Sequence, residues 1–133
     1  LTSIDLPNAT SIGSYAFSQC YALTSIGVPA ATWFGTNAFS ACSALTTLDL
    51  PSATVLNHNA FFGCKKLTSI ILRANQICTL SGDLAFYLTP IENGTGYIYV
   101  PRSLVTEYRN ATNWAAVAEQ IRAIEDYPEI TGG

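Results

Sequence analysis

Apolar side chains return at the same positions every 22 residues through the first part of the chain. Residues 1–22 read LTSIDLPNATSIGSYAFSQCYA, residues 23–44 read LTSIGVPAATWFGTNAFSACSA, and residues 45–66 read LTTLDLPSATVLNHNAFFGCKK. A fourth, divergent unit, residues 67–88, begins as LTSIILRANQICTL and leaves the pattern after Leu80. One such unit cannot bury its own apolar face, so the repeat indicates stacked units that share one core.

Each unit is predicted to open with a short strand. Ile4 and Leu6 are two residues apart, so their side chains point to one face of an extended segment. A proline follows in each of the first three units and ends the strand, because it cannot donate to a ladder: Pro7, Pro29 and Pro51. The segment around Phe17 has room for one helical turn. We expect parallel strands, one per unit, about 4.8 Å apart.

The run I-G-x-x-A-F-x-x-C-x-x-L, here Ile12 to Leu23, has three copies in register. It resembles the BspA-like class of leucine-rich repeat over residues 1 to about 80. The resemblance implies a leucine-rich-repeat solenoid, an α/β fold of mainly short parallel strands with short helical turns. The ninth position of each unit departs from the commonest leucine-rich pattern, which has Asn or Cys there; this chain has Ala9, Ala31 and Ala53.

Residues 89–127 are predicted to form a C-terminal strand-plus-helices cap, and residues 128–133 a tail. A turn-rich loop precedes an alternating strand, residues 97–100, which Pro101 ends. Ser103 is expected to cap one helix and Asn113 a second. The second helix would carry an apolar stripe: Trp114, Val117, Ala118, Ile121 and Ile124. The segment from Tyr99 to Trp114 is similar to one that closes such arrays in gut-bacterial surface proteins.

No comparable cap stands before the first unit. Leu1, Ile4 and Leu6 would therefore lie on an exposed rung unless earlier repeats cover it. We expect the natural protein to extend upstream, and this chain to self-associate through the uncapped rung, since unpaired edge strands invite pairing.

Charge and hydropathy argue against two classes of protein: those that bind nucleic acid and those with a membrane-spanning helix. The net charge of −3 and a pI near 4.8 argue against nucleic acid. No apolar run reaches the roughly 18 residues that a membrane-spanning helix needs. Charged residues are 11% of the chain, against about 25% in a typical globular protein.

The four cysteines are interpreted as buried thiols, with no disulfide and no metal site. Cys20, Cys42 and Cys64 are 22 residues apart and would form one ladder, in which three equivalent residues cannot all pair. Cys78 is assigned to the position of Ile12 in the first unit. Zinc is disfavoured because no C-x₂-C spacing and no His partner exist.

The sequence gives little support for a catalytic function. His58, the single histidine, reads as an exposed loop residue, and no G-x-S-x-G motif accompanies it. Asp5 and Asp49 would lie two rungs apart, roughly 10 Å by strand spacing, beyond the separation of about 5–9.5 Å that glycosidase pairs use. No calcium loop or phosphate-binding glycine motif is present. We predict a protein that is not an enzyme and has no cofactor.

The outward positions of the first strand in each unit are the candidate binding face. They form two rows: Ser3, Ser25, Thr47 and Ser69, and then Asp5, Gly27, Asp49 and Ile71. Trp33 and Tyr21 are expected outside this strand, as packing or loop residues.

The resemblance implies a bacterial cell-surface or secreted protein whose array mediates adhesion to host proteins, cells or glycans. The alternative is a structural spacer that displays another domain, which the small outward residues favour, because they lack the Trp, Tyr and Arg anchors of interface hot spots.

Overall fold

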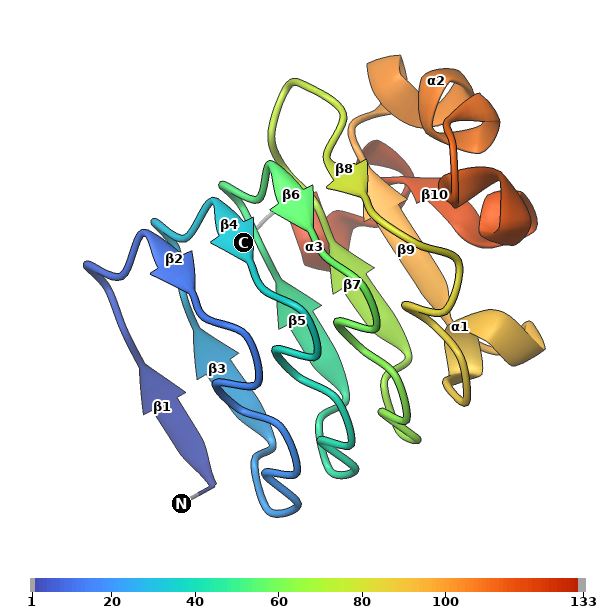
Figure 1. Ribbon diagram of the computed structural model, residues 1–133. Coiled ribbons are helices and arrows are strands. Elements are labelled where there is room, and N and C mark those ends of the chain that lie inside the picture. Colours follow the sequence, from blue (N-terminus) through green and yellow to red (C-terminus); the bar gives the residue numbers. More distant parts are fainter. Residues whose placement is uncertain (1, 132–133) are drawn as a thin grey trace.

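The computed structural model describes residues 2–131, which wind into a solenoid whose successive coils lie side by side (Figure 1). The first strand of each unit is where the repeat predicts it: β1 (Ser3–Asp5), β3 (Ser25–Gly27), β5 (Thr47–Asp49) and β7 (Ser69–Ile71). β1 pairs with β3, and β5 with β7, in parallel and with a 22-residue offset. β9 (Tyr97–Val100) and β10 (Ile121–Ala123) extend the β5–β7 pair into a four-stranded sheet in the order β5-β7-β9-β10, whereas β1 and β3 form a separate two-stranded sheet on the same side of the coil. We call these two sheets together the main sheet. The solenoid predicted from the sequence is confirmed.

A second parallel sheet, which the repeat pattern did not predict, runs along another side of the coil. It contains two-residue strands in the order β2 (Ser11–Ile12), β4 (Trp33–Phe34), β6 (Val55–Leu56) and β8 (Thr79–Leu80). Leu80 pairs with Leu56, so Leu80 occupies the position that had been assigned to Cys78. The assignment of Cys78 was wrong because the fourth unit carries two additional residues before β8, which shift its register. Trp33 lies in β4, outside the candidate face but within a strand.

The third side consists of turns, where one helical turn had been expected. Residues at alternate positions donate backbone hydrogen bonds to the next unit: Tyr15 to Thr36 O, Phe17 to Ala38 O and Gln19 to Ser40 O, at 2.8–2.9 Å. Both Tyr15 and Gln19 have a φ of 63°. The left-handed residues turn the chain so that its N–H groups point along the solenoid, which an α-helical turn would not allow.

Equivalent side chains stack into ladders in the core. Phe17, Phe39, Phe61 and Phe86 follow one another with ring centroids 5.7–6.0 Å apart. The ladder continues into the cap, because Phe86 meets Trp114 at 5.9 Å. The first unit is less covered: Ile4, Leu6, Ala9, Phe17 and Cys20 are only partly buried. Ile4 and Leu6 belong to the rung that was predicted to be exposed, whereas Leu1 lies outside the described residues. Self-association through this rung stays a prediction.

The cap contains the strand predicted at 97–100, with helices that differ from the expected ones. They are α1 (Pro90–Asn93), the 3₁₀ helix η1 (Arg102–Leu104), α2 (Val105–Asn110), the 3₁₀ segment η2 (Trp114–Gln120), the 3₁₀ helix η3 (Ile124–Asp126) and α3 (Pro128–Thr131). The prediction of one amphipathic helix from Trp114 to Ile124 was wrong, since the apolar residues at its end belong to β10 and η3.

Two predicted helix caps were also wrong. Ser103 lies inside η1, which Pro101 precedes without a side-chain cap. Asn113 occupies the N-cap position of η2, but its side chain donates 2.7 Å to Leu80 O instead. Part of the predicted tail is ordered too, because residues 128–131 form α3; residues 132–133 lie outside the described range.

Within residues 2–131, no helix is long and apolar enough to cross a membrane.

Candidate interaction face

The first row of outward strand positions is open over three units. Ser3, Ser25 and Thr47 are exposed, and Ser69 is half-buried. Their hydroxyl groups extend from strands whose middle residues, such as Ile26 and Leu48, are buried in the core. The alternation follows from the period of two in a strand, and it confirms the outward direction predicted for this row.

The second row changes character along the solenoid. Asp5 and Asp49 are exposed and Gly27 is half-buried, but Ile71 is only 7% exposed. Ile71 points out of the main core into a second apolar cluster with Tyr99 and Ile124, against which Tyr97, Tyr127 and Ile130 pack. Its expected exposure was wrong, because the end of the chain folds back over β7 and β9.

The segment that lies over β7 and β9 contains Ile124, Tyr127 and Ile130, and we call it the cover. Aromatic contacts hold it in place. The ring of Tyr127 meets Tyr99 edge-on at 4.9 Å, and the guanidinium of Arg122 lies 4.7 Å above the Tyr97 ring. Burial raises the pKa of the Tyr99 phenol, and the nearby Tyr127 adds to the increase. The outward face of β7 and β9 is therefore largely covered: Ile71 and Tyr99 are buried, and Ser69 and Tyr97 are half-buried.

Asp49 has a partner within the chain. Arg73 Nε lies 3.0 Å from Asp49 Oδ1, and Arg73 Nη2 lies 3.0 Å from Asp49 Oδ2. Arg73 Nη2 also donates 3.1 Å to Ile130 O in the cover. This bidentate ion pair marks the boundary between the open and the covered parts of the face.

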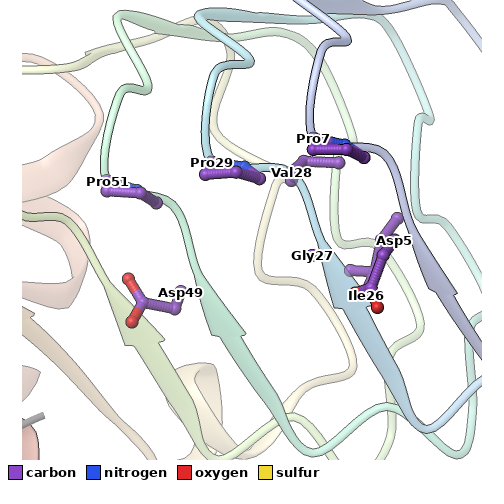
Figure 2. Close-up of a pocket in the computed structure, with 8 residues that line it drawn as sticks. All are labelled: Asp5, Pro7, Ile26, Gly27, Val28, Pro29, Asp49 and Pro51. Atoms are coloured by element: carbon purple, nitrogen blue, oxygen red, sulfur yellow. The ribbon is translucent and has the colours of Figure 1, made fainter.

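A groove of about 390 Å³ crosses the open part. We call it the Gly27 groove, and it is lined by Asp5, Pro7, Ile26, Gly27, Val28, Pro29, Asp49 and Pro51. Figure 2 shows the three prolines in a row across successive units, with the two aspartates on the strands below them. The Asp5 carboxylate lies over residue 27, which has no side chain: a Cβ there would lie 2.5 Å from Asp5 Oδ1. Both aspartates belong to the second row of the candidate face predicted from the sequence, whereas the three prolines had been predicted only to end the strands.

The other candidate residues stand apart from this face. His58 is exposed, as predicted. Cys42, Cys64 and Cys78 are buried as predicted, while Cys20 is half-buried at the first rung. Sγ of Cys42 donates 3.0 Å to Phe17 O, and burial raises the pKa of the Cys78 thiol to about 12. Among residues 2–131, no three His, Cys, Asp or Glu side chains gather as metal ligands.

Comparison with known families agrees with this architecture. The family model described as "BspA type Leucine rich repeat region (6 copies)" matches residues 1–107. The match extends beyond the fourth unit into the predicted cap, where β9 continues the main sheet. No curated protein matches the chain. Repeats of this family generally serve as protein-interaction scaffolds. The chain belongs to the BspA-type leucine-rich-repeat family.

Proposed function

We propose that the protein is a non-enzymatic adhesion module, located at a bacterial cell surface or secreted, that binds host proteins, cells or glycans through its repeat surface. The observation that carries the proposal is the exposed polar strand face of the first three units, which contains the Gly27 groove beside its second row. Family membership supports a role in protein interaction and a surface location.

The composition of the face supports a specific way of binding. Hydroxyl groups of Ser3, Ser25 and Thr47 offer donors and acceptors at one side chain per rung. The Gly27 groove beside them adds an apolar recess with carboxylates. Polar groups in a regular row around a recess can bind an extended peptide or a glycan with several weak contacts.

A non-binding spacer is the second candidate. It is favoured by the position of the exposed aromatic residues, because Tyr15, Tyr21 and Trp33 all lie outside the candidate face. Such residues are the usual interface anchors, and a spacer needs none on its strand face.

Biolayer interferometry against a panel of extracellular-matrix proteins and glycans separates these functions. The test variant is Ser25→Arg/Thr47→Arg, which places two bulky charges on the face, and the matched control is Ser11→Arg/Thr79→Arg, at two exposed strand positions of the second sheet. Saturable binding that the test variant loses and the control keeps supports the proposal. Equal binding by both variants contradicts it, and a folded protein that binds nothing on the panel favours the spacer.

A further inference from the structure

The repeat supplies an internal comparison for the Gly27 groove. Asp5 and Asp49 hold the same position in the first and third units. Each carboxylate reaches toward the next rung: Asp49 toward Arg73, and Asp5 over Gly27. Both aspartates point toward the next unit from equivalent backbone positions, and they differ in the residues of that unit that lie beside them.

The seventh residue of the next unit determines whether a cationic side chain lies beside the aspartate. Arg73 stands there in the fourth unit, where the three earlier units have Pro7, Pro29 and Pro51. Asp49 therefore receives a guanidinium from the chain itself, whereas Asp5 faces a unit whose seventh residue is Pro29. Among residues 2–131, no side chain forms an ion pair or a hydrogen bond with the Asp5 carboxylate.

The groove also has the shape that the absent side chain would need. Pro7, Pro29 and Pro51 supply apolar surface beside the aspartates, and the aliphatic stem of an arginine packs on such surface while its charged end stays at a polar group. The volume of about 390 Å³ lies at the lower end of the range for ligand pockets. The protein's net charge of −3 favours a cationic partner.

We infer that the Gly27 groove binds an arginine side chain of a protein partner, with its guanidinium on Asp5 as the guanidinium of Arg73 is on Asp49. This inference rests on the proposed function and adds the chemistry of the ligand. Arginine is expected over lysine, because its planar fork makes two parallel bonds to a carboxylate and a lysine ammonium does not.

The test is an NMR titration of the ¹⁵N-labelled protein with the peptide acetyl-Gly-Arg-Gly-amide. The same peptide with citrulline keeps the size and shape of the side chain and removes its charge, and a lysine peptide keeps the charge and removes the fork. We expect the arginine peptide to shift amide signals of residues 3–5 and 25–28, and to bind about two- to fivefold more tightly than the citrulline peptide.

Two variants of the groove have matched controls. Asp5→Asn should weaken binding about two- to fivefold, while Asp83→Asn makes the same change of net charge at an exposed residue outside the groove and should bind as the wild type does. Pro29→Arg supplies a guanidinium from within, as the fourth unit does, and should abolish peptide binding, while Pro29→Ala should retain it.

The inference is overturned if the citrulline peptide binds as tightly as the arginine peptide, if Asp5→Asn binds normally, or if the shifted amides lie on the cap. Its failure is distinct from failure of the proposed function. A protein that binds a panel ligand through Ser25 and Thr47 but shows no arginine preference keeps its adhesion role and loses only this ligand chemistry.

Discussion

The two halves of the main sheet have the same backbone and opposite surroundings. Over β1, β3 and β5 the outward residues are small and polar and face solvent; over β7 and β9 they include Ile71 and Tyr99, which are 7% and 8% exposed. The inward residues hardly differ, with an isoleucine or leucine at the middle of each strand. Outward residues therefore decide which part of a solenoid can bind a partner, and a chain that returns over its own sheet removes that part of the face.

The largest expected effect concerns the cap end of the core. Trp114→Ala should lower the free energy of unfolding by ~3–5 kcal/mol, since it creates a cavity and removes a large buried side chain. The indole packs on Phe86 and Tyr108, and its Nε1 donates 2.8 Å to Cys78 O. Trp33→Ala is the control in the other half. Trp33 is 41% exposed, so its loss should cost less than about 1 kcal/mol. Equal costs in urea unfolding would contradict this account of the core.

Ile71→Ala sharpens the contrast between the covered and the open face. The loss of a buried isoleucine should cost ~2–4 kcal/mol, because its neighbours Tyr99 and Ile124 lie in a closed cluster. Thr47→Ala in the neighbouring strand should cost less than about 1 kcal/mol. Chemical denaturation measures both values, and a small effect for Ile71→Ala would mean that the cover does not pack on β7 in solution.

The turn side offers a test at two equivalent positions. Ala41 and Gly63 occupy the same place in successive units, with φ of 60° and 78°. A left-handed conformation costs a residue with a Cβ about 1 kcal/mol, so Ala41→Gly should stabilise the protein by up to that amount, and Gly63→Ala should destabilise it comparably. A Cβ on Gly63 would meet Ala41 Cα at 3.7 Å, an ordinary contact, so backbone strain rather than a clash is measured. Changes of the same sign in the free energy of unfolding of the two variants would contradict the left-handed conformation of these residues.

The smallest effect belongs to the ion pair at the boundary. Arg73→Gln should cost ~0.5–1 kcal/mol and less at 1 M NaCl, because the pair is partly exposed to solvent. Its side chains are 32% and 45% exposed. Arg102→Gln is the control, since its pair with Asp126 is more exposed, at 59% and 56%. Hydrogen exchange at α3 should increase in Arg73→Gln but not in Arg102→Gln. Unchanged exchange in Arg73→Gln would mean that the ion pair does not stabilise the cover.

Much of the fold was predictable because the repeat encodes it. Period-two positions such as Ile4 and Leu6 predicted the strands of the main sheet, and the 22-residue spacing of Cys42 and Cys64 predicted a buried ladder. The second sheet escaped prediction because strands of two residues, such as Val55–Leu56, are too short to show alternation. The left-handed residues carry only a partial signal: Asn37, Asn59 and Gly63 favour that conformation, whereas Tyr15 and Ala41 at equivalent positions of other units do not.

Long-range contacts explain what the sequence could not show about the site. Ile71 was interpreted as exposed because its local pattern matches Asp5 and Asp49, whereas the residues that cover it, Tyr127 and Ile130, come more than 50 positions later. The apolar spacing from Trp114 fits a helix, yet Ile121 joins β9 as a further strand because the edge of the sheet was available there. Periodicity reports which side chains are buried, and only tertiary context decides against which element.

The division of the face into an open and a covered part is tested most directly by NMR with a soluble paramagnetic probe that broadens exposed methyl signals. The structure predicts strong broadening of the Thr47 methyl and protection of the Ile71 methyls, which lie on neighbouring strands. The substitution Ile130→Ser, which weakens the cover, should increase the broadening of Ile71 and leave Thr47 unchanged. Equal broadening of Thr47 and Ile71 in the wild-type protein would contradict the account, because the whole strand face would then be open.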